Sequence, residues 1–492
     1  MGDERDCQTF AEGSKRLDSI TIVNGRRGTQ SATSAAVIEG DAIERLNAIR
    51  IGDVLADVPG VFFSGLNGPR ETPQIRNTLS FDNRTLFLED GVPLQSSVFF
   101  DQSALGYSTA LASPGAVEVL RGPGTALYGS DAFTGVIQAR SQETSESFEG
   151  NARARYGEFG LFDGAVSINA PLGEGQALRV TGAVAGEDGF RDETAFHRAH
   201  GLIRHTADRG AFSVDSLFTY TSSETESATS IPLPDFEAGL DGGSGLNPQV
   251  DPEDAIEEVE YLRLQSTLAY KTDTAIGAAR FEVTPYLRSQ DVESTLTFQP
   301  ATTPREFADV DTFGLLPRAY FDHSDGSTTI IGVDLEFTEL DLLLEQSRPS
   351  VVVFGDLFVQ GTQFDYSVDF NAYSPYIQHE RELLDGLKLT LGLRYDRLRY
   401  DFENALEDVP GDARFQVADR VDTFDAVSPK VRLLWDVTPD HQVFARYARG
   451  FRAPRASELY ELEAGQAEFV LDPETADSGE IGWRAQWFGD RL

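Results

Sequence analysis

Side chains capable of acid–base, nucleophilic or metal chemistry are few and scattered in this sequence. It contains six histidines and a single cysteine, Cys7. Only His197 and His200 stand close enough together to suggest a pair of metal ligands, and isolated surface histidines are the better interpretation. The sequence shows no nucleophile elbow, phosphate-binding loop or cysteine cluster. It therefore predicts no catalytic residue, no metal site and no enzyme activity.

Acidic side chains dominate the charge of the chain. The net charge of -39 argues against nucleic-acid binding, because phosphates attract basic surfaces. Between residues 224 and 260 there are eleven carboxylates and neither Lys nor Arg. We expect a solvated acidic loop there. Calcium binding is the alternative, but the spacing of the carboxylates does not match an EF-hand loop.

Length and hydropathy limit the possible architectures. A chain of 492 residues is too long for one ordinary domain of roughly 100–200 residues, so we expect two domains. No segment approaches the ~18 consecutive apolar residues that a membrane helix needs. A soluble protein or a β-barrel remains, because only helices and closed barrels satisfy their backbone inside lipid. The acidic start of the chain contains no signal peptide, so an exported protein would be represented here without its leader.

The first 140 residues combine helix and strand signals. Asp41, with Glu44 three residues later, predicts a helix start with Asp41 as N-cap. A second helix is predicted over residues 51–58, before the Pro-Gly pair at 59–60. Strands are predicted at residues 85–89 and 116–120. These elements predict a small α+β domain.

Beyond about residue 148 the pattern becomes that of long β-strands. Leu391, Leu393 and Tyr395 alternate with polar Arg394 and Asp396, which predicts one apolar and one polar face. A soluble sandwich would give the same alternation. Short turns recur on one side of the expected sheet, and longer, more acidic connections recur on the other, as in outer-membrane barrels. We therefore expect about 14 antiparallel strands of about ten residues in a transmembrane β-barrel.

Ordered motifs then give a resemblance to a known family. Residues 53–61, 74–77, 86–93 and 117–123, the last together with 126–129 and 135–137, resemble, in order, the plug motifs of TonB-dependent outer-membrane receptors. The Gly-Phe-Arg-Ala-Pro sequence at 450–454 and the segments at 471–474 and 480–482 resemble later parts of their barrel. Two departures are Asn77, where the family usually has Gly, and Phe133-Thr134, where a second small residue is common.

The resemblance implies how the chain is divided. We expect a disordered leader at residues 1–17, a TonB box and linker at 18–28, a plug domain at 29–142 and a transmembrane β-barrel at 143–492. Plugged transporters of this class have about 22 strands. The barrel is therefore expected to be incomplete at its C-terminal end, as a fragment or as a truncated gene product.

The resemblance also implies a function. It indicates a transporter in the outer membrane of a Gram-negative bacterium that contacts lipid and is energised by the TonB protein. The expected cargo is an iron chelate, most often a ferric siderophore, with cobalamin or carbohydrate as alternatives. Iron is expected only within that chelate, and no cofactor is expected. Haem is not expected, since no His follows the Phe-Arg-Ala-Pro box before Pro473. A passive porin or adhesin-like barrel and a soluble β-rich enzyme are the rival classes.

Three sets of site residues follow from the resemblance. The TonB box is expected at Ser19, Ile20, Thr21, Ile22 and Val23, where β-branched residues favour an added strand. A latch between plug and barrel is expected from Arg76 and Arg121 to Glu480, which parity turns inward when Ile481 and Trp483 face lipid. The candidate ligand-facing residues are Arg70, Phe99, Phe100 and Arg452.

Overall fold

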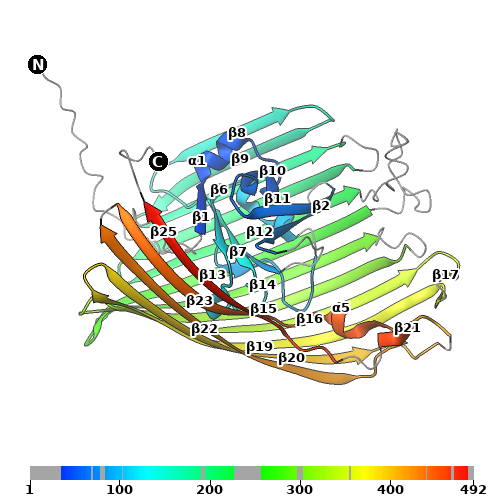
Figure 1. Cartoon of the computed structure of the whole chain (residues 1–492). Helices are drawn as coiled ribbons and strands as arrows, with labels where there is room; N and C mark the ends of the chain where they lie inside the picture. The colour runs from blue at the N-terminus through cyan, green and yellow to red at the C-terminus, as the bar shows by residue number, and fades with distance from the viewer. Residues whose placement is uncertain are drawn as a thin grey trace, which may run out of the picture.

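The computed structural model describes residues 35–485, except 68–69, 78–83, 102–103, 190–193, 227–255, 296–302, 354–355, 410, 439 and 467–469. It divides into an N-terminal domain, called the plug here, and a large curved sheet, called the wall. Figure 1 shows the wall curving around the plug. The predicted TonB box and leader lie outside the described residues, as does most of the acidic segment at 224–260.

The plug is a small mixed domain built on a five-stranded sheet with the order β1-β6-β7-β4-β5. A separate hairpin, β2-β3, extends from it. Its elements are β1 (Ala35–Glu39), α1 (Gly40–Leu46), α2 (Ile51–Leu55), β2 (Val61–Asn67), β3 (Arg70–Ile75), β4 (Thr85–Glu89), β5 (Val92–Pro93), η1 (Ala104–Tyr107), η2 (Thr109–Leu111), β6 (Pro114–Arg121), α3 (Thr125–Tyr128) and β7 (Gly135–Ser141).

The two predicted plug helices are present, with corrections at their ends. The N-cap of α1 is Glu39 without a side-chain cap, and Asp41 lies in the first turn rather than capping it. An acidic group there still favours the positive end of the helix dipole. Helix α2 ends at Leu55, earlier than predicted. Asp53 explains its start, because its carboxylate accepts the N–H groups of Ile49 and Arg50 at 3.1 and 3.0 Å.

The wall is a fourteen-stranded antiparallel sheet with two edge strands, β8 and β25. Its strands run to as many as 24 residues, longer than predicted, because they continue past the apolar belt: on β15 the outward residues change from Phe313 to Asp311 and Asp309. They are β8 (Glu149–Tyr156), β9 (Phe162–Gly173), β10 (Gln176–Glu187), β11 (Phe196–Arg209), β12 (Phe212–Glu226), β13 (Ile256–Thr274), β14 (Gly277–Thr295), β15 (Arg305–His323), β16 (Thr328–Gln346), β19 (Gly361–Leu384), β20 (Leu387–Asn404), β22 (Arg420–Thr438), β23 (His441–Arg452) and β25 (Glu474–Ala485).

The two ends of the wall differ in their connections. Tight turns such as those between β9 and β10 and between β19 and β20 occupy one end, called the turn end. The other, the loop end, carries longer connections that hold β17 (Val351–Val353), β18 (Asp356–Phe358), β21 (Arg414–Gln416), α5 (Ala456–Tyr460), β24 (Glu461–Glu463) and η4 (Ala464–Gln466). In Figure 1 the β2 strand of the plug points toward the end where β17, β21 and α5 lie. The predicted asymmetry between turns and loops is therefore confirmed.

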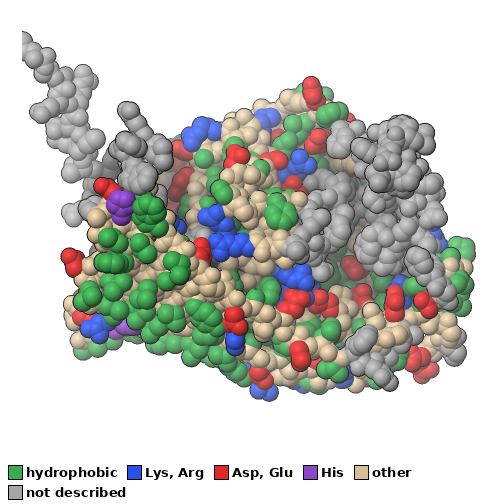
Figure 2. All heavy atoms as spheres, viewed as in Figure 1, with side chains coloured by type: hydrophobic (Ala, Val, Ile, Leu, Met, Phe, Trp, Pro, Cys, Tyr) green, Lys and Arg blue, Asp and Glu red, His purple; other side chains and the backbone are tan. Residues whose placement is uncertain are grey.

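The polarity of the wall is the reverse of that in a soluble sandwich. On β20, Leu391, Leu393 and Tyr395 face outward and are 45%, 50% and 39% exposed. Between them, Arg394 and Asp396 face the plug and are buried. Figure 2 shows hydrophobic side chains gathered at the lower left, over the outer face of the wall. A sheet with apolar residues outside and charges inside is suited to lipid.

Ile481 and Trp483 on β25 are also exposed on the outer face, as parity predicted. Across the described residues, none of the helices has the length and apolar character needed to cross a membrane.

Replacement of one outward leucine tests this polarity. Leu393→Arg places a charge on the outer face of β20, about midway along the strand, and we expect a loss of about 2–4 kcal/mol in the free energy of unfolding from phospholipid vesicles. Leu384→Arg at the turn end, where the side chain is 69% exposed, is the matched control and should cost about 0–1 kcal/mol. Equal, small effects in urea titrations of the two variants would contradict a lipid-facing surface.

Candidate functional site

The interface between plug and wall depends on arginines that project inward from the wall strands. Eight of them donate hydrogen bonds to backbone carbonyl groups of the plug, seven at 2.7 to 3.3 Å. Arginine suits this role because it stays charged and offers five donors. The pairs are Arg153 with Leu111, Arg155 with Ala48, Arg198 with Ile49, Arg204 with Ser141, Arg263 with Glu89, Arg288 with Pro93, Arg394 with Leu127 and Arg446 with Pro123.

One ion pair at this interface is completely buried. Glu89, at the end of β4, lies 2.8 Å from Arg263 on β13, and neither side chain has any exposed surface. The other Glu89 oxygen accepts the backbone N–H of Thr109 at 2.7 Å and its hydroxyl at 2.8 Å. Ser108 adds a third donor at 3.2 Å. A buried pair is tolerated only with such additional hydrogen bonds.

A second charged contact follows at the next residue. Asp90 accepts the Ser141 hydroxyl at 2.8 Å and lies 3.8 Å from Arg204 on β11. Its backbone has φ +48° and that of Gly91 has φ +82°. Asp and Gly are the residues that tolerate this left-handed turn best. Burial raises the pKa of Asp90, and the guanidinium of Arg204 opposes that shift. The turn thus places two carboxylates against two wall arginines.

Two of the three predicted latch residues lie in direct contact. Arg76 forms a two-bond contact with Glu480 at 3.1 and 3.3 Å. Arg121 lies beside this pair and donates to the Pro59 carbonyl at 2.6 Å. Burial and the neighbouring charge of Arg76 lower the pKa of Arg121, and Glu480 opposes them. The structure therefore places these three residues in one cluster next to β25.

A second contact between the plug and β25 was not predicted from the sequence. Arg84 of the plug donates two hydrogen bonds to Glu474 on β25, both at 3.0 Å. Glu474 stands six residues before Glu480, so the two side chains share the inward face of the strand. The even spacing of the two glutamates was the sequence signal that could have indicated this contact. β25 thus contacts the plug through two carboxylates.

The structure changes the interpretation of the candidate ligand-facing residues. Phe99 is 6% exposed and packs in the main apolar core, so it is a core residue rather than a ligand-facing one. Arg452 is buried and bonds to Glu458 at 2.8 and 2.9 Å and to Glu474 at 3.1 Å, so its guanidinium serves the wall. Phe100 is half-buried beneath Arg455, 4.1 Å from ring centre to guanidinium carbon. The side chain of Arg70 lies outside the described residues.

Glu71 forms a further titratable contact near the wall. This β3 carboxylate accepts the Gly52 N–H at 2.9 Å and lies 3.7 Å from the Arg50 guanidinium. Arg198 of β11 holds the neighbouring Ile49 carbonyl at 2.8 Å. Burial raises the pKa of Glu71 to about 7, although the positive charge of Arg50 opposes it. Glu71 therefore changes charge near neutral pH.

Comparisons with known proteins match both parts of the chain. The family described as TonB-dependent Receptor Plug Domain matches residues 27–136. The family described as TonB dependent receptor-like, beta-barrel matches residues 189–492, more than half of the chain.

Curated relatives match a shorter segment. Vitamin B12 transporter BtuB of Vibrio vulnificus is 32% identical over 161 residues, which are 32% of this chain and 25% of that protein. The iron-regulated outer membrane virulence protein of Vibrio cholerae is 30% identical over 156 residues, which are 30% of this chain and 24% of that protein. The matched segment thus spans about a quarter of these relatives' length.

Solved structures share the fold at low identity. The unliganded ferric citrate transporter FecA gives a TM-score of 0.72 at 17% identity and covers 92% of this chain and 68% of FecA. The siderophore receptor PiuA of Acinetobacter baumannii gives 0.70 at 16% identity, with 94% and 71% covered.

The buried Glu89–Arg263 pair should contribute to the stability of the folded protein. Glu89→Gln leaves the Arg263 charge buried without its carboxylate, and we expect a loss of about 3–5 kcal/mol in the free energy of unfolding. The control Arg397→Gln breaks an exposed pair with Asp425 at 3.5 Å, and should cost about 0–1 kcal/mol. Denaturant titration of the detergent-solubilised protein measures both. A Glu89→Gln loss no larger than that of the control would contradict the assigned role.

The raised pKa of Glu71 should make the stability of the folded protein depend on pH. Its pKa is about 7 in the folded protein against an ordinary value of 4.5, so the folded state binds more protons between these values. Stability should therefore fall as pH rises from about 4.5 to 7, by an amount on the order of 3 kcal/mol. Glu71→Gln should flatten this slope and be the more stable protein at pH 8. Melting temperatures of both proteins across this range provide the test, and an unchanged slope would contradict it.

Proposed function

The chain belongs to the TonB-dependent receptor family, and from this premise we propose that it is an outer-membrane transporter that imports a scarce nutrient by energised movement of its plug. The wall arginines that bond backbone carbonyl groups of the plug carry the proposal, since they come from strands β8 to β23 and hold the plug on several sides. A lumen filled by a domain held in this way does not open by thermal motion alone, because several buried hydrogen bonds must break together. An external energy source therefore fits this arrangement.

A ferric siderophore is the cargo that we favour. The solved structures that share the fold include a ferric citrate transporter and a siderophore receptor. Their identity to this chain is low, so they support the fold more strongly than the cargo. Cobalamin is the second candidate, because the B12 transporter BtuB is similar over 161 residues. A carbohydrate remains a third possibility within the same family.

The rival classes fit the structure less well. A passive porin or adhesin-like barrel needs no plug, whereas here wall arginines from strands β8 to β23 bond the plug backbone. A soluble enzyme would not expose leucines along the outer face of its sheet. Transport across the outer membrane accounts for both the plug and this outer face.

The TonB protein is the proposed periplasmic partner. Strand β1 lies at the edge of the plug sheet and pairs with β6. A force applied to the chain before Ala35 therefore reaches β1 first. The proposed TonB box, residues 19–23, precedes this strand and can add to a sheet edge of TonB through its backbone.

A proline in the TonB box tests this function. Ile22→Pro removes a backbone donor from the added strand, and we expect accumulation of labelled cargo to be abolished while binding at the cell surface is retained. Ile22→Val, which keeps the donor and the β-branch, is the control. Cells that make the full protein should be assayed with iron chelates, cobalamin and haem as separate labelled cargoes.

The outcomes separate the alternatives. Unchanged accumulation in Ile22→Pro would contradict the TonB-box assignment, and loss of both binding and accumulation would indicate that the segment is a strand of the plug. Accumulation of cobalamin alone would replace the siderophore as cargo. Binding of haem with a spectrum typical of His ligation would contradict its exclusion.

A further inference from the structure

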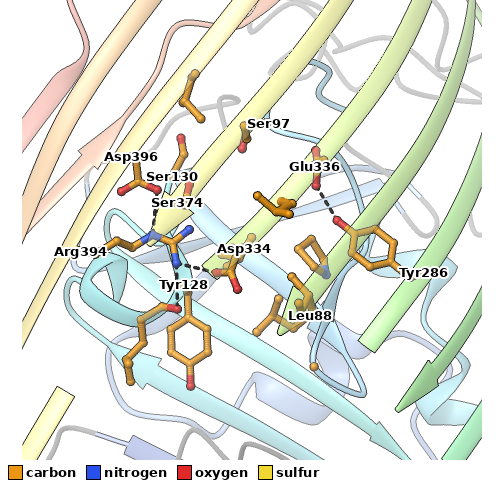
Figure 3. A pocket seen from close by; sticks show the side chains of 18 of the residues that line it. Leu88, Ser97, Tyr128, Ser130, Tyr286, Asp334, Glu336, Ser374, Arg394 and Asp396 are labelled. Atoms are coloured by element: carbon orange, nitrogen blue, oxygen red, sulfur yellow. Dashed lines mark hydrogen bonds and ion pairs between the residues drawn. The ribbon is translucent and has the colours of Figure 1, made fainter. Parts of the chain in front are cut away.

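A small cavity with both polar and apolar side chains in its lining lies between the plug and the middle strands of the wall. Its volume is about 80 Å³, and it is lined from the plug by Leu88 and Tyr128 and from the wall by Asp334, Ser374 and Arg394. Figure 3 shows Arg394 between Asp334 and Asp396, with Tyr128 below them. Ligand pockets for drug-sized molecules usually measure about 300–1,000 Å³. This cavity therefore has room for a few water molecules rather than for a chelate.

The charges around the cavity are neutralised within the wall itself. Arg394 donates to Asp396 at 2.7 Å and to Asp334 at 2.5 Å. Arg318 lies 3.8 Å from Asp334, so a second guanidinium shares that carboxylate. Glu336 accepts the Tyr286 hydroxyl at 2.8 Å. These wall residues thus keep their charge partners whether or not the plug lies against them.

Two carboxylate oxygens at the cavity indicate water. The Oδ1 atom of Asp334 and the Oδ2 atom of Asp396 are buried and accept no hydrogen bond from the described residues. Asp396 is 1% exposed. Buried polar atoms of this kind are normally satisfied by ordered water in a polar cavity. Ordered water is the expected partner of these two oxygens.

The plug touches this part of the wall through neutral groups. Arg394 donates to the Leu127 carbonyl at 3.3 Å. Its guanidinium packs so closely on Gly129 that a Cβ atom there would lie 2.6 Å away. The Ser96 hydroxyl donates to Glu336 at 2.5 Å. Separation of these groups leaves no unpaired charge on the plug.

The other face of β4 behaves differently. Side chains alternate along a strand, so Leu88 borders the cavity while Glu89 points away from it toward β13. There the wall contact is the fully buried pair with Arg263. Movement at that face would leave two buried charges without partners, which is far more costly than breaking neutral hydrogen bonds.

We infer that the plug stays anchored at Glu89 and opens at the cavity, so that the passage for cargo forms between α3 and strands β16, β19 and β20. This inference rests on the proposed transport function. Arg394 is a positioning residue here: it holds the 127–129 turn while the passage is closed, and Asp334 and Asp396 keep its charge satisfied once the turn leaves. The passage is then lined by Arg318, Asp334, Glu336 and Arg394.

Thiol accessibility in living cells tests the location of the opening. The native Cys7 is replaced by Ser, and a single cysteine is placed either at the cavity or beside the Glu89–Arg263 anchor. Ser374→Cys lies at the cavity on β19 and is 2% exposed. Thr219→Cys, on β12 opposite Arg263 and 0% exposed, is the matched control. Cells making the full protein receive a charged methanethiosulfonate reagent, with the inner membrane either energised or treated with an uncoupler.

We expect energisation to raise the labelling rate at Ser374→Cys roughly tenfold or more, because labelling follows the population of the open state. Thr219→Cys should not respond, and Ile22→Pro should remove the response at Ser374→Cys. If Ser374→Cys does not fold, Ala372→Cys, which lines the same cavity on β19, replaces it.

The other results overturn the inference in distinguishable ways. An energised response at Thr219→Cys, alone or equal to that at the cavity, places the opening elsewhere while TonB-driven movement stands. A lack of response at both sites, in protein whose melting temperature is unchanged, contradicts the proposed function together with the inference.

Discussion

Arg263 and Glu89 are both fully buried, and a buried ion pair is tolerated when the two charges meet closely and additional hydrogen bonds support them. Ser108 and Thr109 donate to the second carboxylate oxygen of Glu89, and Arg263 also donates to the Glu89 carbonyl. This requirement determines where β4 must lie against β13. The Asp90–Gly91 turn then sets the second wall contact, with Arg204.

The polarity of the wall creates the same constraint on a larger scale. Because the apolar belt of the outer face excludes charge, the charged residues at that level of the wall face inward, and each inward guanidinium needs an acceptor. The plug provides many of these acceptors as backbone carbonyls, including those of Ile49, Pro93 and Leu127. Every residue has a carbonyl group, so such attachment depends on the path of the plug backbone rather than on particular side chains.

Contacts between plug and wall therefore differ in how easily they break. The side chains of Arg76 and Glu480 are 40% and 19% exposed, so water can hydrogen-bond to each of them when the pair separates. The Arg394 contact at the cavity is a single hydrogen bond to a neutral carbonyl. The Glu89–Arg263 pair differs from both, because its two partners are charged and neither is exposed to solvent. A plug held in this uneven way can move at the cavity while it stays attached at Glu89.

The sequence alone was sufficient for the features that depend on local pattern. Alternation along β20, the tight turns at one end of the wall and the ordered plug motifs predicted the two domains, the fourteen strands and the inward direction of Glu480. Arg76 and Glu480 were paired only through the family resemblance. Tertiary structure decided which charges meet: Glu89 with Arg263, Arg84 with Glu474, Arg394 with Asp334 and Asp396. These partners lie on different strands, and their meeting depends on the register of the sheet and on how the plug is seated in it, neither of which follows from periodicity along one strand. The same seating buried Phe99 and Arg452, because local sequence shows that a side chain is apolar or charged but not what packs over it.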